Sequence, residues 1–73
     1  MTKRLPQVKP REVIAALMRA GFDVHHTTGS HYVLKRDQLR VTVAYHKRNL
    51  KRGTLASIIR QAGLTPADFT ELL

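Results

Sequence analysis

The sequence contains no cysteine and no tryptophan, and only two phenylalanines and two tyrosines among its 73 residues. Without thiols the chain can form neither a disulfide nor a thiolate zinc site, so its fold must depend on one compact apolar core. Acidic residues are also scarce, and no apolar run approaches the roughly 18 residues of a membrane-spanning helix. These absences favour a small soluble domain, expected in the cytoplasm, with neither a membrane span nor a signal peptide.

Positive charge is what the chain has in excess, since thirteen Lys and Arg accompany only five Asp and Glu, for a formal net charge of +8. Such a field indicates an anionic partner, with nucleic acid as the first candidate and an acidic protein surface as the second. Between residues 35 and 60 there are eight basic side chains and a single acid, Asp37. Like charges repel unless an anion joins them, so this stretch is the predicted RNA-binding region. Its candidate residues are Lys35, Arg36, Arg40, Lys47, Arg48, Lys51 and Arg52.

Hydrophobic periodicity predicts one domain over residues 9–73, preceded by a flexible basic arm over residues 1–8. Gly21 and Gly63 each follow a stretch of helical spacing and are predicted to end a helix. The expected elements in chain order are a helix over 10–20, strands over 22–27, 31–36 and 39–45, a helix opened by Gly53 with Thr54 as its N-cap, and a short helix capped by Thr65 before Pro66.

Short links between the three strands predict an antiparallel meander, and hence an α+β fold of order α-β-β-β-α with a short C-terminal helix. A three-stranded antiparallel sheet covered by helices on one face leaves the other face open, as in double-stranded-RNA-binding domains. Because side chains alternate along a strand, Tyr32 and Leu34 are expected to face the core, and His31, Val33 and Lys35 the opposite side.

The tripeptide Gly29-Ser30-His31 places an imidazole beside a turn, at the start of the second predicted strand. Imidazole can take and return a proton near neutral pH. RNA carries its own nucleophile, because a base that removes the 2′-hydroxyl proton lets that oxygen attack the adjacent phosphorus. His31 is therefore a candidate general base or acid, and this route requires no metal and no cofactor. The alternative interpretation is a strand-edge histidine without chemistry.

The other three histidines are weaker candidates. His46, at the end of the third strand, could act as the second acid–base group, bind phosphate, or be a solvated loop residue. His25 and His26 are expected to point to opposite faces of a strand, one packed and one exposed, with no assigned role. The four histidines include no helical i, i+4 pair, so a metal site is not predicted.

Several segments, in this order, resemble the HicA toxin family, which are small mRNA interferases of type II toxin–antitoxin pairs. They are Gly29-Ser30-His31 with the apolar strand after it, Val41–His46, Leu50–Leu55 and Ile58–Leu64. The resemblance extends from about Pro10 to Phe69. It departs at Ala44, where many relatives have proline, and at His25-His26.

The resemblance implies a double-stranded-RNA-binding-like fold, endoribonuclease activity on mRNA, and a catalytic histidine at the position of His31, placed by Gly29 and Ser30. It also implies a HicB-type antitoxin that covers the site, with a free toxin that is monomeric and a larger assembly with the antitoxin. Two other functions remain open from the residues alone. One is a non-catalytic module that binds structured RNA by backbone and shape, and the other is a protein-interaction subunit with an acidic partner.

Overall fold

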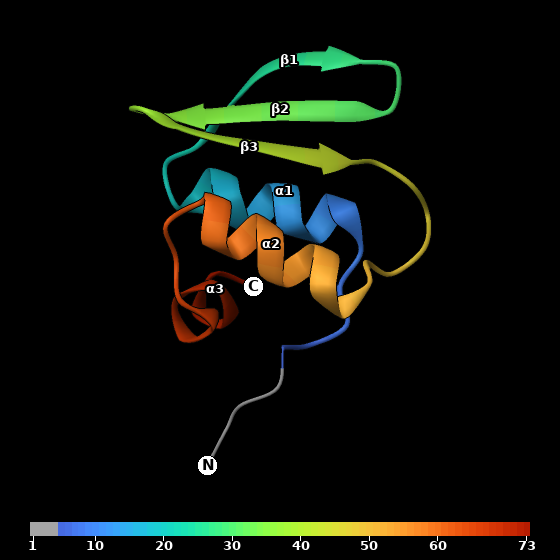
Figure 1. Cartoon of the computed structure of the whole chain (residues 1–73), viewed down its shortest axis with the longest axis vertical. Helices are drawn as coiled ribbons and strands as arrows, with labels where there is room; N and C mark the ends of the chain where they lie inside the picture. Colours follow the sequence, from blue (N-terminus) through green and yellow to red (C-terminus); the bar gives the residue numbers. More distant parts are fainter. Residues whose placement is uncertain (1–4) are drawn as a thin grey trace.

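A three-stranded antiparallel sheet with helices on one of its faces makes up the molecule (Figure 1). The computed structural model describes residues 5–73. This arrangement confirms the predicted α+β fold and its order of elements. Among the described residues, no helix is long and apolar enough to cross a membrane. The elements are α1 (Pro10–Arg19), β1 (Asp23–Thr28), β2 (His31–Arg36), β3 (Leu39–Ala44), α2 (Arg52–Gln61) and α3 (Pro66–Leu72).

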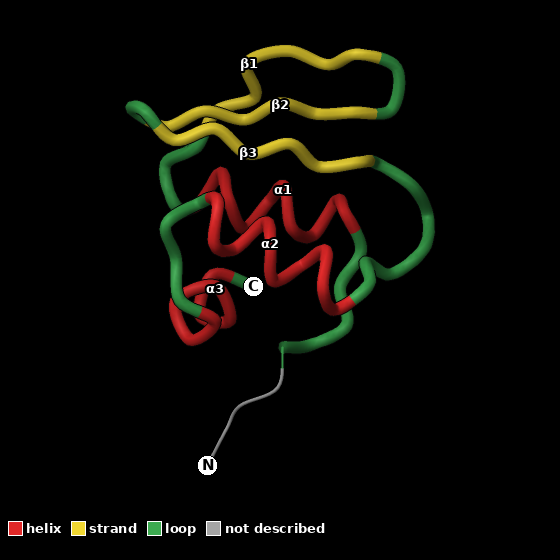
Figure 2. The backbone as a smooth tube through the Cα atoms, viewed as in Figure 1, coloured by secondary structure: helices red, strands yellow, loops and turns green. Residues whose placement is uncertain are grey.

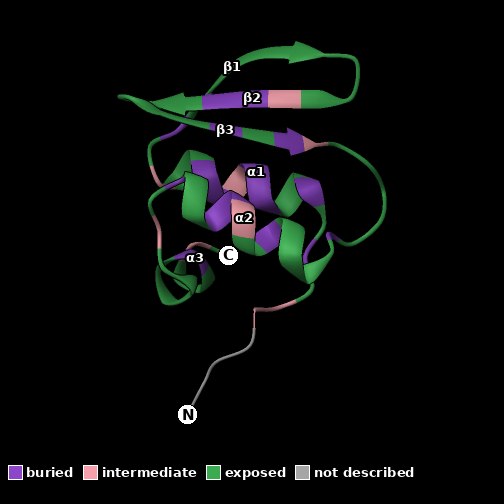
Figure 3. Cartoon of the chain, in the orientation of Figure 1, coloured by how far each residue is buried: buried purple, intermediate pink, exposed green. Residues whose placement is uncertain are grey.

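The core lies between the sheet and the two longer helices, α1 and α2, which share the same face of the sheet (Figures 1 and 2). Val13 and Leu17 are one helical turn apart on α1 and meet Leu34 and Val41 from the strands. Buried positions follow this one side, whereas β1 is exposed along its whole length (Figure 3). The largest fully buried side chains are Phe22, Phe69, Leu17, Leu34, Leu55, Val13, Val41, Val43 and Pro10.

Strand order β1-β2-β3 and the pairing register define the uncovered face. Leu34 is fully buried and Tyr32 packs partly against the core, which confirms the predicted direction of both. Val33 is also buried, but it lies outside the core cluster and on the opposite face, as the alternation predicts. Paired residues share a face, so the open face consists of three rows: Thr28–His31–Ala44, His26–Val33–Thr42 and Asp23–Lys35–Arg40.

A β-bulge in β1 overturns the expectation for His25 and His26. The register shifts between Val24 and His26, so that Val24 pairs with Leu34 and His26 with Val33, on opposite faces of the sheet. Both histidines are exposed, and their rings meet edge to face with centroids 5.4 Å apart. Simple alternation fails here because a bulge inserts one unpaired residue and turns the strand.

Gly21 and Gly63 end α1 and α2 as predicted, each through a Schellman motif. After α2, the Gly63 N–H donates to the Arg60 carbonyl at 3.0 Å and the Leu64 N–H to the Ile59 carbonyl at 3.1 Å. Leu64 then packs against the core, which directs the chain back toward α3.

The sequence predicted the start of α3 correctly and the start of α2 incorrectly. The capping box of α3 is confirmed, because the Asp68 N–H donates to Thr65 Oγ1 at 3.1 Å and the Thr65 N–H to Asp68 Oδ2 at 3.3 Å. The predicted N-cap of α2 at Thr54 is wrong, since the helix begins at Arg52 and its N-cap is Lys51, without a side-chain cap. The buried Leu50 anchors the chain just before this point, so the helix starts earlier than the cap signal indicates.

The end of the predicted N-terminal arm lies against the domain. Of residues 1–8, residues 1–4 fall outside the described part of the chain. Val8 is 3% exposed and belongs to the core cluster, and Leu5 packs partly against it. The Leu50 N–H donates to the Val8 carbonyl at 2.8 Å, which ties this segment to the loop between β3 and α2.

Alanine at Gly63 is expected to destabilise the domain by about 1–2 kcal/mol, because φ is +71° there and a Cβ disfavours the left-handed region. Gly53→Ala is the matched control, since its Cβ would meet nothing within 4 Å and it lies in α2 with an ordinary φ. That control should raise the free energy of unfolding by roughly 0.5–1 kcal/mol. Urea unfolding of both variants measures the difference, and equal stabilities would contradict the assigned helix end.

Candidate functional site

The turn between β1 and β2 presents His31 to solvent. Gly29 and Ser30 form a two-residue hairpin loop, and Gly29 has φ +56°, which a glycine adopts at no steric cost. Thr28 and His31 are paired across the two strands at the base of this loop. His31 also pairs with Ala44 on β3. His31 is exposed on the open face, so its side chain is accessible from solvent.

The loop between β3 and α2 begins beside this turn. The Tyr45 N–H donates to the Ser30 carbonyl at 2.6 Å, which continues the β2–β3 pairing past His31. His46 follows directly and is exposed, and its Nδ1 accepts a hydrogen bond from the Arg48 N–H at 3.1 Å. Nδ1 is therefore occupied as an acceptor, and Nε2 is the ring nitrogen left to face a ligand as a donor.

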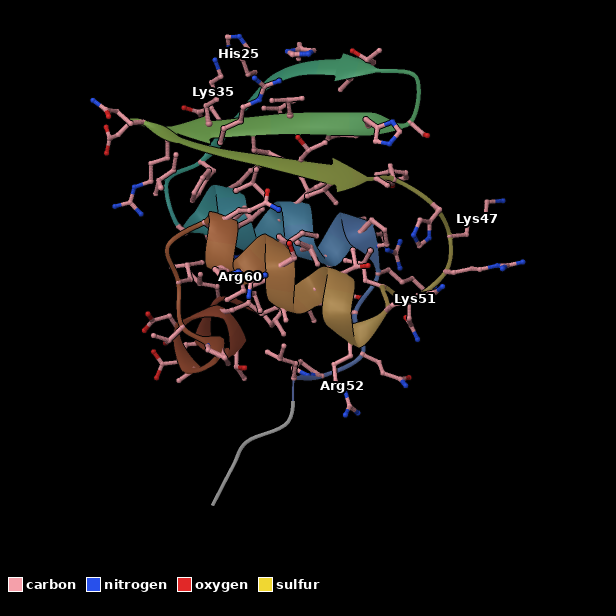
Figure 4. All side chains as sticks on the ribbon, viewed as in Figure 1. His25, Lys35, Lys47, Lys51, Arg52 and Arg60 are labelled. Atoms are coloured by element: carbon pink, nitrogen blue, oxygen red, sulfur yellow. The ribbon has the colours of Figure 1, made fainter. Side chains whose placement is uncertain are left out.

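The predicted cations fall into two groups. Lys47, Arg48, Lys51 and Arg52, here called the loop cations, lie in or directly after the β3–α2 loop and are all exposed. Figure 4 shows Lys47 and Lys51 along this loop and Arg52 below it, at the start of α2. The chain thus gathers four cations after the strand that pairs with His31.

Lys35 and Arg40, here called the hairpin cations, form the last row of the open face, at the opposite end of the sheet from His31. Figure 4 shows Lys35 and His25 projecting from the sheet on the side away from the helices. Lys35 is four residues beyond His31, which corresponds to about 13 Å along a strand. The hairpin cations therefore share the face of His31, but not its immediate surroundings.

Arg36 is the one predicted RNA-binding residue that the fold turns elsewhere. Its Nη1 donates to the Ala20 carbonyl at 2.8 Å, and its side chain lies against Gly21, so that it faces the helical side of the sheet. The guanidinium satisfies a carbonyl at the end of α1, which is a structural use of the charge. Ser30 makes no side-chain hydrogen bond among the described contacts, and its backbone carbonyl is the group that contacts the β3–α2 loop.

Helix dipoles add to the positive charge at one end of the molecule. The first residues of α1 and α2 lie at the same end as the start of β2 and the β3–α2 loop (Figure 1). The positive ends of both helix dipoles thus coincide with the loop cations. Residues 5–73 contain no cluster of three or more His, Asp or Glu able to hold a metal ion.

A groove beside the β3–α2 loop contains residues that sequence reasoning missed. It has a volume of about 360 Å³ and is lined by Lys9, Arg11, Tyr45, His46 and Lys47. Phe22 and Phe69 supply the core aromatics, which leaves Tyr45 free to be 41% exposed at the groove. With only four aromatic residues in the chain, the sequence predicted too few rings for base stacking. The structure shows which ones lie outside the core, because the two phenylalanines are buried and Tyr45 is exposed.

A family model places these features in a known context. The model described as the HicA toxin of bacterial toxin–antitoxin systems matches residues 10–64, most of the chain, including His31, Tyr45 and His46. A comparison with curated proteins finds no match. The matched range runs from the start of α1 to the Schellman motif after α2, and so spans the whole sheet and both of its covering helices. The chain therefore belongs to the HicA family, the toxins of bacterial toxin–antitoxin systems.

Proposed function

We propose that this toxin acts in the cytoplasm as an mRNA-cleaving endoribonuclease, with His31 as its acid–base group, and that a HicB-type antitoxin inhibits it. The observation that carries the proposal is an exposed imidazole on the open face, placed by a tight turn that is hydrogen-bonded to a loop with four cations. Membership of a toxin family supplies the biological setting, because a toxin of this kind has a cognate antitoxin.

The proposed reaction uses the nucleophile that RNA carries. Neutral His31 removes the proton from a 2′-hydroxyl, and the oxygen attacks the adjacent phosphorus. The bond to the 5′-oxygen breaks, which leaves a 2′,3′-cyclic phosphate and a free 5′-hydroxyl after that oxygen gains a proton. Proton transfer of this kind contributes about 10²–10⁴-fold to a rate. The route needs neither a metal ion nor a cofactor.

The surrounding cations stabilise the negative charge that grows on the phosphate in the transition state. Lys47 and Arg48 follow the strand position opposite His31 and are the nearest of them in the chain's topology. His46 is best suited to donate from Nε2 to a phosphate oxygen, because its Nδ1 already accepts from Arg48. The hairpin cations, about 13 Å along the strand, contact a neighbouring phosphate of the same RNA.

The proposed antitoxin contact follows from the same charge distribution. A net charge of +8 repels a second copy of the chain, and so favours a monomer in the absence of a partner. An antitoxin with an acidic surface would neutralise the loop cations and cover His31, which blocks access of RNA. Toxin and antitoxin would then form a larger assembly.

A second candidate function is a module that binds structured RNA without cutting it. The observation in its favour is the uncovered sheet face, which carries Lys35 and Arg40 at one end and requires no chemistry from His31. An RNA-cleavage assay distinguishes this binding module directly from the proposed endoribonuclease.

We expect His31→Ala to lower the rate of RNA cleavage by about 10²–10⁴-fold while the affinity for RNA and the melting temperature stay unchanged. His25→Ala is the matched control, because it removes another exposed imidazole from the same sheet and should cleave normally. The assay follows a labelled transcript with chelator present. If His31→Ala cleaves as fast as the parent protein, the proposed mechanism is wrong, and an intact transcript with the parent protein would favour the binding module.

The salt dependence of RNA affinity should distinguish Lys35 and Arg40, which we propose to contact RNA, from Arg36, which we propose does not. In a His31→Ala background, replacing both Lys35 and Arg40 by glutamine should reduce the slope of log Kd against log salt by about 1–2, since each lost phosphate contact releases about one counterion fewer. Arg36→Gln should leave that slope unchanged and instead lower stability, because it removes the hydrogen bond to Ala20. The reverse pattern would place RNA on the helical side of the sheet.

A further inference from the structure

We propose that the groove lined by Lys9, Arg11, Tyr45, His46 and Lys47 is a nucleotide-binding subsite for unpaired RNA. An unpaired base stacks on Tyr45, and the adjoining phosphate lies among the three cations. This inference rests on the proposed RNA substrate and narrows it, because it predicts that the bound segment is single-stranded next to the reacting bond.

The two sides of the groove come from distant parts of the chain and are held together by the backbone. The Leu50 N–H donates to the Val8 carbonyl at 2.8 Å, and a side-chain hydrogen bond from Asn49 Nδ2 to Gln7 Oε1, at 3.4 Å, adds to this backbone contact. Val8 and Leu50 are both buried, so this junction is part of the core. The junction places Lys9, immediately after Val8, beside the β3–α2 loop.

The groove has the composition of a site for an anion next to a ring. Its lining includes three cations and no carboxylate. Glu12, the nearest acid in sequence, does not line the groove, and its Oε1 accepts a hydrogen bond from the Lys9 N–H at 2.9 Å in the capping box of α1. The free Nε2 of His46 adds a donor. Together these groups offer positive charge and hydrogen-bond donors to a phosphate.

Tyr45 provides a ring whose position is fixed before RNA arrives. One side of it rests on Tyr32, with ring centroids 5.2 Å apart and planes inclined by 32°. The remaining surface is 41% exposed and borders the groove. An exposed aromatic ring flanked by cations is the combination that proteins use to hold unpaired bases, whose π-faces a duplex keeps stacked inside.

The groove lies at the same end of the sheet as His31, but on the opposite face from the proposed cleavage site. Tyr32 is adjacent to His31 in β2, so the two side chains lie on opposite faces of the sheet. The Tyr45 N–H is bonded to Ser30, directly before His31. An RNA strand that passes around this end of the sheet would therefore place one base in the groove and the next phosphodiester at His31. A rigid duplex could not follow this path.

The test measures binding in a His31→Ala background, with a labelled single-stranded RNA oligonucleotide and with the same sequence as a duplex. Tyr45→Ala should weaken single-strand binding by roughly 5- to 150-fold, the usual effect of a lost stacking ring, and should leave duplex binding unchanged. Tyr45→Phe keeps the ring and should bind within about twofold of the background protein. Lys9→Gln with Arg11→Gln should reduce the salt slope for the single strand by about 1–2.

The outcomes separate this inference from the cleavage proposal. Unchanged single-strand binding by Tyr45→Ala, with its melting temperature intact, overturns the subsite even if His31 proves catalytic. An equal loss for duplex and single strand also overturns it. If His31→Ala still cleaves while Tyr45→Ala loses single-strand binding, the subsite stands and the cleavage mechanism fails. Retained RNA binding by Tyr45→Ala, with lost affinity for the purified antitoxin, would assign the groove to the protein partner instead.

Discussion

One-sided burial of the sheet is the constraint on which the rest of the structure depends. The strands direct Leu34, Val41 and Val43 toward α1 and α2, and burial of this apolar layer stabilises a domain whose sequence has no cysteine for a disulfide. A sheet that is covered once must expose its other face. In this chain that face carries His31, Lys35 and Arg40, so the same burial that folds the protein also presents its candidate chemistry.

A second consequence concerns charge. Thirteen cations in a small domain repel one another, and the fold places most of those discussed here in solvent, where water screens them. Arg36 is also exposed, but its guanidinium donates a hydrogen bond to the Ala20 carbonyl at the end of α1. Within residues 5–73, the side chains of the loop cations have no such carbonyl partner, and they lie next to the positive ends of two helices. An anionic partner, whether RNA or an acidic antitoxin, would relieve that repulsion.

Local sequence signals predicted the order of the helices and strands and the exposure of His31 on the open face. Alternation along β2 correctly separated Leu34 from Lys35, and the glycines at 21 and 63 correctly marked the helix ends. The errors arose where a neighbouring segment overrides local preference. A bulge brought His25 and His26 together, and the buried Leu50 moved the start of α2 to Arg52. Neither influence is visible in a window of a few residues, because each depends on a pairing or a contact with another segment.

By itself, the sequence determined the order of helices and strands, the exposure of His31 beside a glycine turn, and the excess of positive charge. These properties follow from periodicity, turn chemistry and composition, which act over short distances along the chain. Only the tertiary structure decided that Lys9 and Arg11 lie beside Tyr45, that the hairpin cations are separated from the loop cations, and that Arg36 lies on the helical side of the sheet. Those outcomes depend on how segments distant in the sequence pack against each other, and the junction of Val8 with Leu50 is the contact that brings the two sides of the groove together.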